Sequence, residues 1–385
     1  MAAILGIGTA NPPNCITQED YPDFCFRVTG SNHLTHFKHR FTSLCEKTGI
    51  KKRYLHLTED ILRENPSLVD HNAPSLELRQ RISEAEIPRL GREAALRATE
   101  DWGQPKSEIT HLIFCAMQAI HMPGADFRLT VSLGLSPSIR RIMLYHQGCH
   151  VSVTALRLAK DIAENNHRAR VLVVCCDMTI GSFRLPCEDD GEDLIMQTIY
   201  GDGAAAVIVG ADLDKSCERP FFRIVGGAQT IIPDSDGALC GRVNENGFSM
   251  DRRTKVPGFI ASAISCHLND FLTKMLHDTG TDTIKDWNAV FWVMQATSKP
   301  VLDRIEAELQ LHKDKLEVSR KVWREYGYMM SSSTLFVLNE VKKRMVEQRN
   351  EGSDYGVMVG FGAGLTLDAV VLQMVPLPPT LELAV

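Results

Sequence analysis

The chain has 385 residues, of which 44% are hydrophobic and 23% are charged, and its formal net charge at pH 7 is −6. These values are typical of a globular protein with one large domain or two of ordinary size. So small a charge indicates neither nucleic acid nor a membrane surface as a partner, and no run of about 18 apolar residues predicts a membrane-spanning helix.

The first half of the chain alternates predicted strands with predicted helices. Strands are expected at 109–118, 138–147 and 169–178, and helices are expected after the first two. An acid-rich loop, CEDDGEDL, follows the third strand, and the glycine turn of YGDGAAAVIVGA then leads into a further buried strand. This alternation predicts an α/β sheet covered by helices.

The second half shows a related order of elements. A helical pattern covers VPGFIASAISCHLNDFLTKML, a strand is expected at 288–295, and Pro300 opens the next helix, where its missing N–H costs little. The chain then reads YGVMVGFGAGLTLDAVVLQMV, which is similar to the GDGAAAVIV segment of the first half. We therefore predict two related halves, residues 1–220 and 221–385.

The eleven cysteines lie mostly in apolar runs such as LIFCAM and VLVVCCDM. This placement predicts reduced, buried thiols rather than a disulfide framework. The N-terminus has no signal-peptide pattern, so we expect a cytoplasmic protein. No CxxC pair and no HExxH motif is present, and no metal site is predicted.

Cys149 stands where a chain would place a nucleophile. A predicted strand runs into Gly148 and Cys149, and a helical pattern starts at once. The unpaired N–H groups of a helix N-terminus favour thiolate over thiol, and Gly148 allows a sharp turn. Cysteine is also among the most buried residue types, so the position alone leaves a structural thiol open.

Several segments, in order along the chain, resemble one enzyme family; they are YHQGC, LRLAKDIAENN, GDGAAAVIVGAD, TIIPDSDGAL, VPGFI and GFGAGLT. They are similar to segments of the plant type III polyketide synthases, the chalcone and stilbene synthase family. The resemblance implies the thiolase fold, with two similar halves in a five-layer αβαβα arrangement. It also implies a homodimer in which Met122 reaches the partner's cavity, small CoA thioesters or ketides as substrates, and no bound cofactor.

In that family a cysteine takes an acyl group from a CoA thioester, and the carbanion from decarboxylated malonyl-CoA attacks it. A histidine and an asparagine stabilise the thiolate and polarise the malonyl carbonyl. Cys149 matches the cysteine. However, Gln295 in FWVMQATSKPV stands at the histidine position, and Tyr328 in EYGYMM stands at the asparagine position.

Both replacements can donate a hydrogen bond, but neither carries positive charge at neutral pH. We therefore expect Cys149 to be mostly a thiol near pH 7. Since losing one oxyanion donor typically costs on the order of a hundredfold in rate, malonyl decarboxylation should be severely reduced. His146 and His150 flank Cys149, but the side chain of His150 should point about 100° away, and local packing is the alternative to a role as base.

The resemblance also implies positions that line the pocket: Ser182, Met196, Tyr200, Leu239, Met250, Met330 and Gly362. Methionine at 196 and 330 would restrict the pocket to small ligands, and ordinary core packing is the alternative. CoA is expected at Arg40, Lys47 and Pro300, with Ser43 at a third position that is basic in the family. Solvated charges on an amphipathic helix are the alternative for the basic pair.

We predict an acyltransferase of plant specialised metabolism that acts on small CoA thioesters or ketides, with impaired malonyl decarboxylation. One alternative is a condensation of a β-keto acid with a small electrophile such as an imine, which needs no decarboxylating histidine and asparagine. Another alternative is a non-catalytic homologue that binds a ligand or pairs with an active relative.

Overall fold

The computed structural model describes the chain except residues 71–72, 186–190, 252–256, 281–283, 348–353 and 377–385, with the backbone alone at 191–193, 251 and 257–261. Its strands are β1 (Ala3–Ala10), β2 (Cys15–Thr17), β3 (Lys52–Tyr54), β4 (His111–Ala116), β5 (Arg140–Tyr145), β6 (Arg170–Asp177), β7 (Gly203–Gly210), β8 (Phe222–Ile231), β9 (Cys240–Asn244), β10 (Gly247–Asp251), β11 (Phe291–Met294), β12 (Tyr355–Gly362) and β13 (Thr366–Met374). Its helices are α1 (Tyr21–Val28), α2 (Thr35–Lys47), α3 (Glu59–Glu64), α4 (Leu76–Trp102), α5 (Ala125–Leu133), α6 (Val151–Asn165), α7 (Gly191–Ile199), α8 (Pro257–Asp278), α9 (Lys299–Glu308), α10 (Glu317–Tyr326) and α11 (Ser332–Glu347).

The main sheet has the strand order β11-β12-β13-β8-β1-β7-β6-β4-β5. Strands β5, β4 and β6 are parallel neighbours, so their carboxyl ends share one edge. Strand β1 pairs with β7 from Ala3 to Ala10, but with β8 only at Ala3 and Ile4. The sheet therefore has two wings, one from each half of the chain, joined through the first residues of β1.

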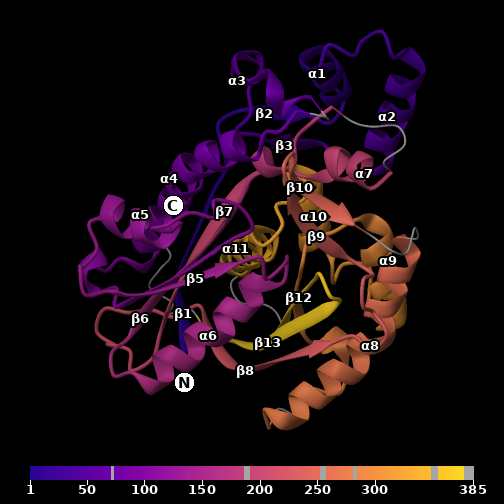
Figure 1. Cartoon of the computed structure of the whole chain (residues 1–385). Helices are drawn as coiled ribbons and strands as arrows, with labels where there is room; N and C mark the ends of the chain where they lie inside the picture. The colour runs from indigo at the N-terminus through magenta and orange to yellow at the C-terminus, as the bar shows by residue number, and fades with distance from the viewer. Residues whose placement is uncertain (71–72, 186–190, 252–256, 281–283, 348–353, 377–385) are drawn as a thin grey trace.

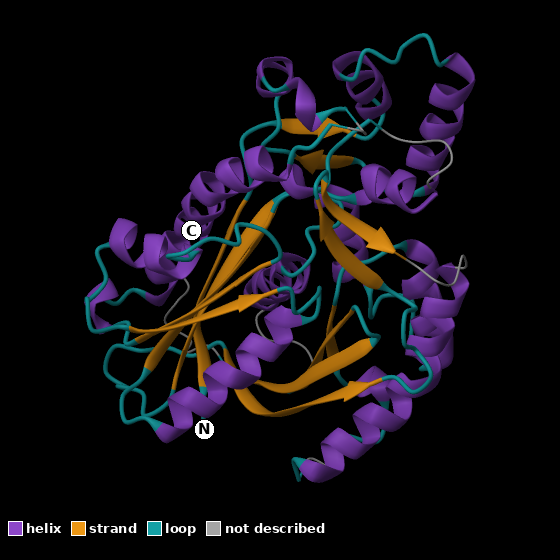
Figure 2. Cartoon of the chain, viewed as in Figure 1, coloured by secondary structure: helices purple, strands orange, loops and turns teal. Residues whose placement is uncertain are grey.

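Helices α6 and α11 lie between the two wings (Figure 2). One apolar core combines both helices with strands of both wings. A second core joins α4 to the outer face of the first-half wing, and a third joins α8 and α9 to the second-half wing. The layers are therefore helix, sheet, helix, sheet, helix, which confirms the predicted thiolase-type α/β fold.

The sequences of the two central helices explain their position. In α6, Val151, Val153, Leu156 and Ala159 are buried, and small residues allow close packing. In α11, the whole stretch from Ser332 to Leu338 is buried, which is the pattern of a helix covered on all sides. The site-bearing turn before α6 is therefore anchored in the middle layer.

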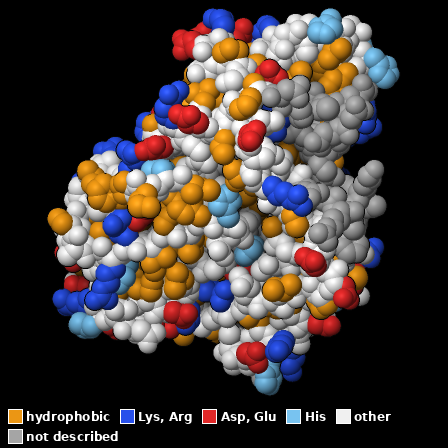
Figure 3. Space-filling view, in the orientation of Figure 1, with side chains coloured by type: hydrophobic (Ala, Val, Ile, Leu, Met, Phe, Trp, Pro, Cys, Tyr) orange, Lys and Arg blue, Asp and Glu red, His pale blue; other side chains and the backbone are white. Residues whose placement is uncertain are grey.

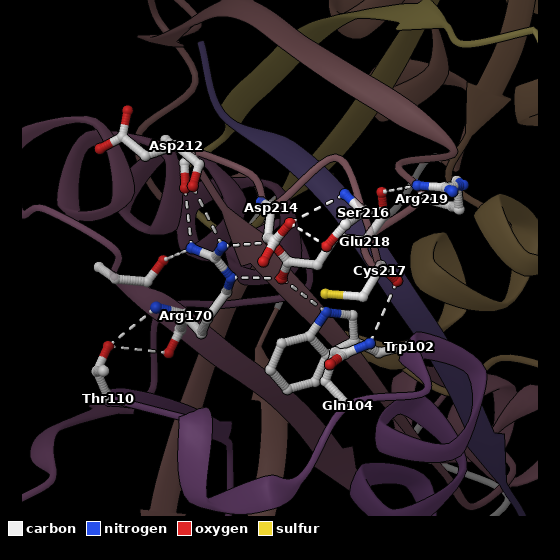
Figure 4. A network of polar contacts seen from close by, with 12 residues as sticks. Trp102, Gln104, Thr110, Arg170, Asp212, Asp214, Ser216, Cys217, Glu218 and Arg219 are labelled. Carbon is white, nitrogen blue, oxygen red and sulfur yellow. Dashed lines mark hydrogen bonds and ion pairs between the residues drawn. The ribbon is translucent and has the colours of Figure 1, made fainter.

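The chain passes from the first wing to the second through residues 211–221, and a buried ion pair fastens this connection (Figure 4). Arg170 Nε and Nη2 lie 2.7 and 2.5 Å from the two carboxylate oxygens of Glu218. Trp102 Nε1 donates to the same carboxylate at 3.0 Å. Although burial opposes ionisation, these donors hold the pKa of Glu218 below its usual value. The predicted boundary at residue 220 lies in this connection, and the division into domains stays a prediction.

Two sequence expectations differ from the structure at element ends. The expected strand 288–295 begins only at Phe291, because Asp286 accepts a hydrogen bond from the Asn288 nitrogen and caps a helical turn at Trp287–Ala289. The loop expected at CEDDGEDL ends earlier, because α7 already begins at Gly191; residues 187–190 lie outside the described residues. Of the helices in the described part of the chain, none is both long and apolar enough to cross a lipid bilayer.

Candidate active site

Cys149 lies at the carboxyl edge of the first-half wing, in the turn between β5 and α6. Two glycines make this turn possible. Gly148 has φ +94°, a conformation that favours glycine, and a Cβ there would lie 3.3 Å from the Ala363 nitrogen. A Cβ at Gly362 would lie 2.9 Å from the Cys149 nitrogen. The glycine loop after β12 therefore packs directly on the cysteine turn.

An apolar and aromatic cluster surrounds the thiol; its members are Cys149, Met117, Phe248 and Met330, with Tyr200, Met250 and Tyr328 packed against it. The side chains come from the turns after β4 and β5, from the residue after α7, from β10 and from the loop between α10 and α11. Cys149 is 8% exposed. Burial raises the pKa of its thiol to about 12, against an opposing hydrogen bond from Tyr328, and the nearby carboxylate of Asp177 raises it further. The thiol is therefore protonated at neutral pH.

Gln295 and Tyr328 form a hydrogen-bonded chain beside Cys149. Gln295 follows β11 and is fully buried. Its Oε1 accepts the Phe361 N–H at 3.0 Å, and its Nε2 donates to the Tyr328 hydroxyl oxygen at 2.9 Å. Tyr328 packs against the cluster that contains Cys149, and its hydroxyl lowers the pKa of the Cys149 thiol. The structure thus brings together the three residues proposed from sequence as the reacting set.

The pKa of the Tyr328 hydroxyl is raised well above its usual value, mainly by burial and also by the neighbouring Cys149. Asp177, at the carboxyl end of β6, accepts hydrogen bonds from the backbone N–H groups of Met117 and Ser331, at 2.9 and 3.0 Å, and from the Ser331 hydroxyl. Burial nevertheless raises the pKa of Asp177. Each of these groups is shifted toward its neutral form because the cluster is dry.

His146 and His150, which flank Cys149 in the chain, are both shifted toward the neutral imidazole by burial. His146 adopts φ +53°, and burial lowers the pKa of its imidazole. His150 is 4% exposed, and burial also lowers its pKa. A Cβ on Gly362 would lie 2.7 Å from His150 Nδ1, so this ring lies under the glycine loop. Within the described residues, neither histidine shares a hydrogen bond with Cys149.

The other expected pocket residues divide into two sets. Tyr200, Met250 and Met330 contact the cysteine cluster. Ser182 and Met196 are both buried, and both make local hydrogen bonds. The Ser182 hydroxyl donates to the Thr179 carbonyl at 3.4 Å, and the Met196 carbonyl accepts the Tyr200 N–H at 3.0 Å. Leu239 instead packs against the core of the second-half wing, and its carbonyl accepts the Gly364 N–H at 3.2 Å.

The expected CoA-binding residues lie on the surface. Arg40 and Lys47 are exposed on α2, and their spacing of two helical turns places them on one face together with Ser43. Pro300 is exposed in the first turn of α9. Any contact of these residues with CoA stays a prediction.

Met122 lies on an apolar surface around α5. It is 97% exposed and follows Ile120, which is 44% exposed. Phe127 and Val131 of α5 are 40% and 64% exposed. Figure 3 shows hydrophobic side chains gathered over α5 and β5. This surface borders the free edge of β5.

Sequence reasoning missed Met117, Phe248, Asp177 and the Phe361 N–H. Two of these had a usable signal, because Met117 and Asp177 are the second-last residues of two predicted strands, and the structure shows these strands to be parallel neighbours whose carboxyl ends meet at one edge. Phe248 stands two residues before Met250 in β10, so both side chains leave the same face. The donor role of Phe361 has no sequence signal, because any backbone N–H could fill it.

The site offers a buried thiol, a phenol and an amide, all neutral. Over the ranges that the structure describes, no group of three or more His, Cys, Asp or Glu lies close enough to hold a metal ion. Neutral donors can orient and stabilise an oxyanion, but they stabilise it less than a cation does. The arrangement therefore suits slow thiol chemistry and hydrogen bonding to a carbonyl oxygen.

Family models match nearly the whole chain. The N-terminal domain of chalcone and stilbene synthases matches residues 1–213, and the C-terminal domain of chalcone and stilbene synthases matches residues 223–376. The two matches fall on the two wings of the fold and include Cys149, Gln295 and Tyr328. This chain belongs to the chalcone and stilbene synthase family.

Proposed function

We propose that the protein is a polyketide synthase-like acyltransferase, in which Cys149 takes a small acyl group from a CoA thioester and malonyl-CoA is decarboxylated only slowly. Membership of the family supports the general activity. The observation that carries the finer proposal is the packing of Tyr328, whose hydroxyl is hydrogen-bonded to Gln295, against the cluster that contains Cys149. It gives the thiol a polar neighbour among mostly apolar side chains.

The proposed step balances without a cofactor. The Cys149 sulfur attacks the thioester carbonyl carbon, the bond from that carbon to the CoA sulfur breaks, and the proton lost by Cys149 ends on the CoA thiol. The Tyr328 hydroxyl lowers the pKa of the Cys149 thiol and so favours the thiolate, which carries the negative charge before it attacks the carbonyl carbon. Because the thiol must first lose its proton, the step is slow at neutral pH.

Malonyl decarboxylation requires stabilisation of an enolate oxygen. Gln295 and Tyr328 are the available donors, and Gln295 already directs one of its two N–H groups at the Tyr328 oxygen. Neither donor is a cation. The bulk of Met330, which is 3% exposed, and of Tyr328 favours small acyl groups. Arg40 and Lys47 are the basic residues that would meet the CoA phosphates.

A homodimer is part of this proposal. The surface of Ile120, Met122, Phe127 and Val131 borders the free edge of β5. An exposed apolar patch beside an unpaired strand edge is typical of an association surface. We propose that a second copy covers it, and that free cysteines such as Cys25 and Cys115 suit a reducing compartment such as the cytoplasm.

Intact-protein mass spectrometry after incubation with acetyl-CoA, butanoyl-CoA and acetoacetyl-CoA at pH 8.5 tests the acyl transfer. We expect a single acyl adduct that is absent in Cys149→Ala. Cys217, which is exposed, serves as the internal control for non-specific acylation after proteolysis. No adduct with any of the three thioesters would contradict the proposal.

The protonated thiol favours one alternative, a condensation of a β-keto acid with a small electrophile such as an imine. That reaction needs no thiolate, because a β-keto acid can lose CO₂ without an enzyme-bound thioester. Product formation from acetoacetate and a cyclic imine that persists in Cys149→Ala would support this alternative over acyl transfer.

A further inference from the structure

The hydrogen bonds of Gln295 have a fixed direction. The Phe361 N–H can only donate, so the atom of Gln295 that faces it at 3.0 Å is the carbonyl oxygen Oε1. The amide nitrogen Nε2 therefore faces the Tyr328 hydroxyl at 2.9 Å. An amide nitrogen donates and does not accept, so the Tyr328 oxygen must be the acceptor of this bond.

The phenol proton of Tyr328 then has no acceptor on Gln295. Tyr328 packs against the cluster that contains Cys149, and a phenol can donate to a sulfur acceptor. The hydroxyl also lowers the pKa of the Cys149 thiol, as a donor to the sulfur would. The Phe361 N–H thus fixes the orientation of the Gln295 amide, and the amide makes the Tyr328 oxygen an acceptor. The phenol proton is then left to point toward the cysteine sulfur. Gln295 is fully buried and its backbone N–H donates to the Val359 carbonyl at 2.9 Å, so the amide is held in place.

We propose that Gln295 is a positioning residue that orients the Tyr328 hydroxyl proton toward the Cys149 sulfur, and that this donor makes Cys149 more reactive than an equally buried thiol. The use of this arrangement for acyl transfer by Cys149 rests on the proposed function. The direction of the hydrogen bonds does not, because it follows from the donors and acceptors alone. It assigns the two replaced family positions a joint role, in which one residue acts on the sulfur through the other.

Two variants separate this role from a merely structural one. Tyr328→Phe removes the donor. Gln295→Glu keeps the shape and the bond to the Phe361 N–H, but it places an acceptor oxygen where Nε2 lies. When the new carboxyl group is ionised, that oxygen takes the phenol proton and turns it away from Cys149. Both variants therefore remove the same hydrogen bond from the sulfur.

The readout is the rate of alkylation of each cysteine by iodoacetamide at pH 8.5, followed by peptide mass spectrometry. Exposed Cys15 and Cys217 in the same sample normalise the rates. We expect each variant to alkylate Cys149 about tenfold more slowly or slower still, since hydrogen bonds to charged groups are among the stronger ones. Thermal melting of each variant confirms that it is folded.

The double variant distinguishes orientation from charge. If Gln295→Glu acts through the phenol, adding it to Tyr328→Phe should change the Cys149 rate by less than about twofold, because the coupled effects do not add. A further loss of tenfold would mean that the new carboxylate repels the thiolate directly, and the proposal would be overturned.

Two results in the wild type and single variants would also overturn the proposal. One is an unchanged Cys149 rate in Gln295→Glu. The other is a wild-type Cys149 that reacts no faster than Cys176, which is fully buried and lies on β6 with no phenol partner in the described contacts. Since alkylation requires no CoA thioester, failure of acyl transfer in the earlier experiment leaves this test intact.

Discussion

The two ends of the first-half wing bury polar groups in opposite ways. At the amino end of β6, Arg170 and Glu218 are both charged and face each other in a dry site (Figure 4). At the carboxyl edge, Cys149, Tyr328 and Asp177 are equally dry, but burial shifts each toward its neutral form. The difference is the buried cation. A charge persists in the interior where a counter-ion with several donors accompanies it.

The comparison teaches how one sheet can be rigid at one end and reactive at the other. The ion pair also receives the Trp102 N–H and holds the chain between β7 and β8. At the carboxyl edge the neutral donors leave protons that can still move. The amino end therefore serves stability, and the carboxyl edge keeps groups whose protonation can change during a reaction.

The largest expected effect is at the amino end. Arg170→Met leaves the Glu218 carboxylate buried without its cation, and breaking a buried pair from one side costs about 3–5 kcal/mol in the free energy of unfolding. Urea denaturation monitored by tryptophan fluorescence measures it. Arg170→Met with Glu218→Met should recover much of the loss. Arg63→Met, which removes an exposed pair with Asp60, should leave stability nearly unchanged. A loss as small as that of Arg63→Met would break the comparison.

The second effect is the pH dependence of Cys149. Because its pKa is raised to about 12, the thiolate is a minor form throughout the range from pH 7 to 9 and grows tenfold with each pH unit. The alkylation rate of Cys149 should therefore rise about a hundredfold across this range. A short unstructured peptide with one cysteine, blocked at both ends, is the matched control, and its rate should begin to level off near the ordinary thiol pKa of about 8.5. A Cys149 rate that levels off below pH 8 would mean that a cation stabilises the thiolate.

The third effect restores the missing charge. Gln295→His with Tyr328→Asn should raise decarboxylation of malonyl-CoA by at least about tenfold, because an imidazole and a carboxamide are stronger partners for the enolate oxygen than the present pair. Release of labelled CO₂ by the wild type, the double variant and Cys149→Ala measures it. Rapid release by the wild type, at the rate of an active chalcone synthase assayed in parallel, would show that the neutral site is not impaired.

The smallest effect concerns backbone strain, which both regions share. Arg168, near Arg170, has φ +54°, and Met330, beside Cys149, has φ +48°. Arg168 is exposed, so Arg168→Gly relieves the left-handed conformation without removing buried surface. We expect it to stabilise the protein by about 0.5–1 kcal/mol in thermal unfolding. Arg81→Gly, in the second turn of α4, should destabilise it instead. A loss of stability in Arg168→Gly would show that this turn is not strained.

The sequence alone determined the class of fold and the place of the cysteine. Strand and helix patterns follow from local periodicity, and the ordered family segments carried the thiolase fold and the positions of Cys149, Gln295 and Tyr328. These features depend on residues close together in the chain or on matched motifs. For the same reason, site residues at the ends of predicted strands, such as Asp177, could have been predicted from the sequence.

The tertiary structure decided what those residues do to one another. Gln295 meets Phe361 across 66 residues and Tyr328 across 33, and no local pattern encodes which atom faces which. The raised pKa of Cys149 comes from side chains of several distant elements that exclude water together. The sequence names the polar groups, but their charge and hydrogen-bond direction depend on burial, because desolvation is a property of the assembled surroundings.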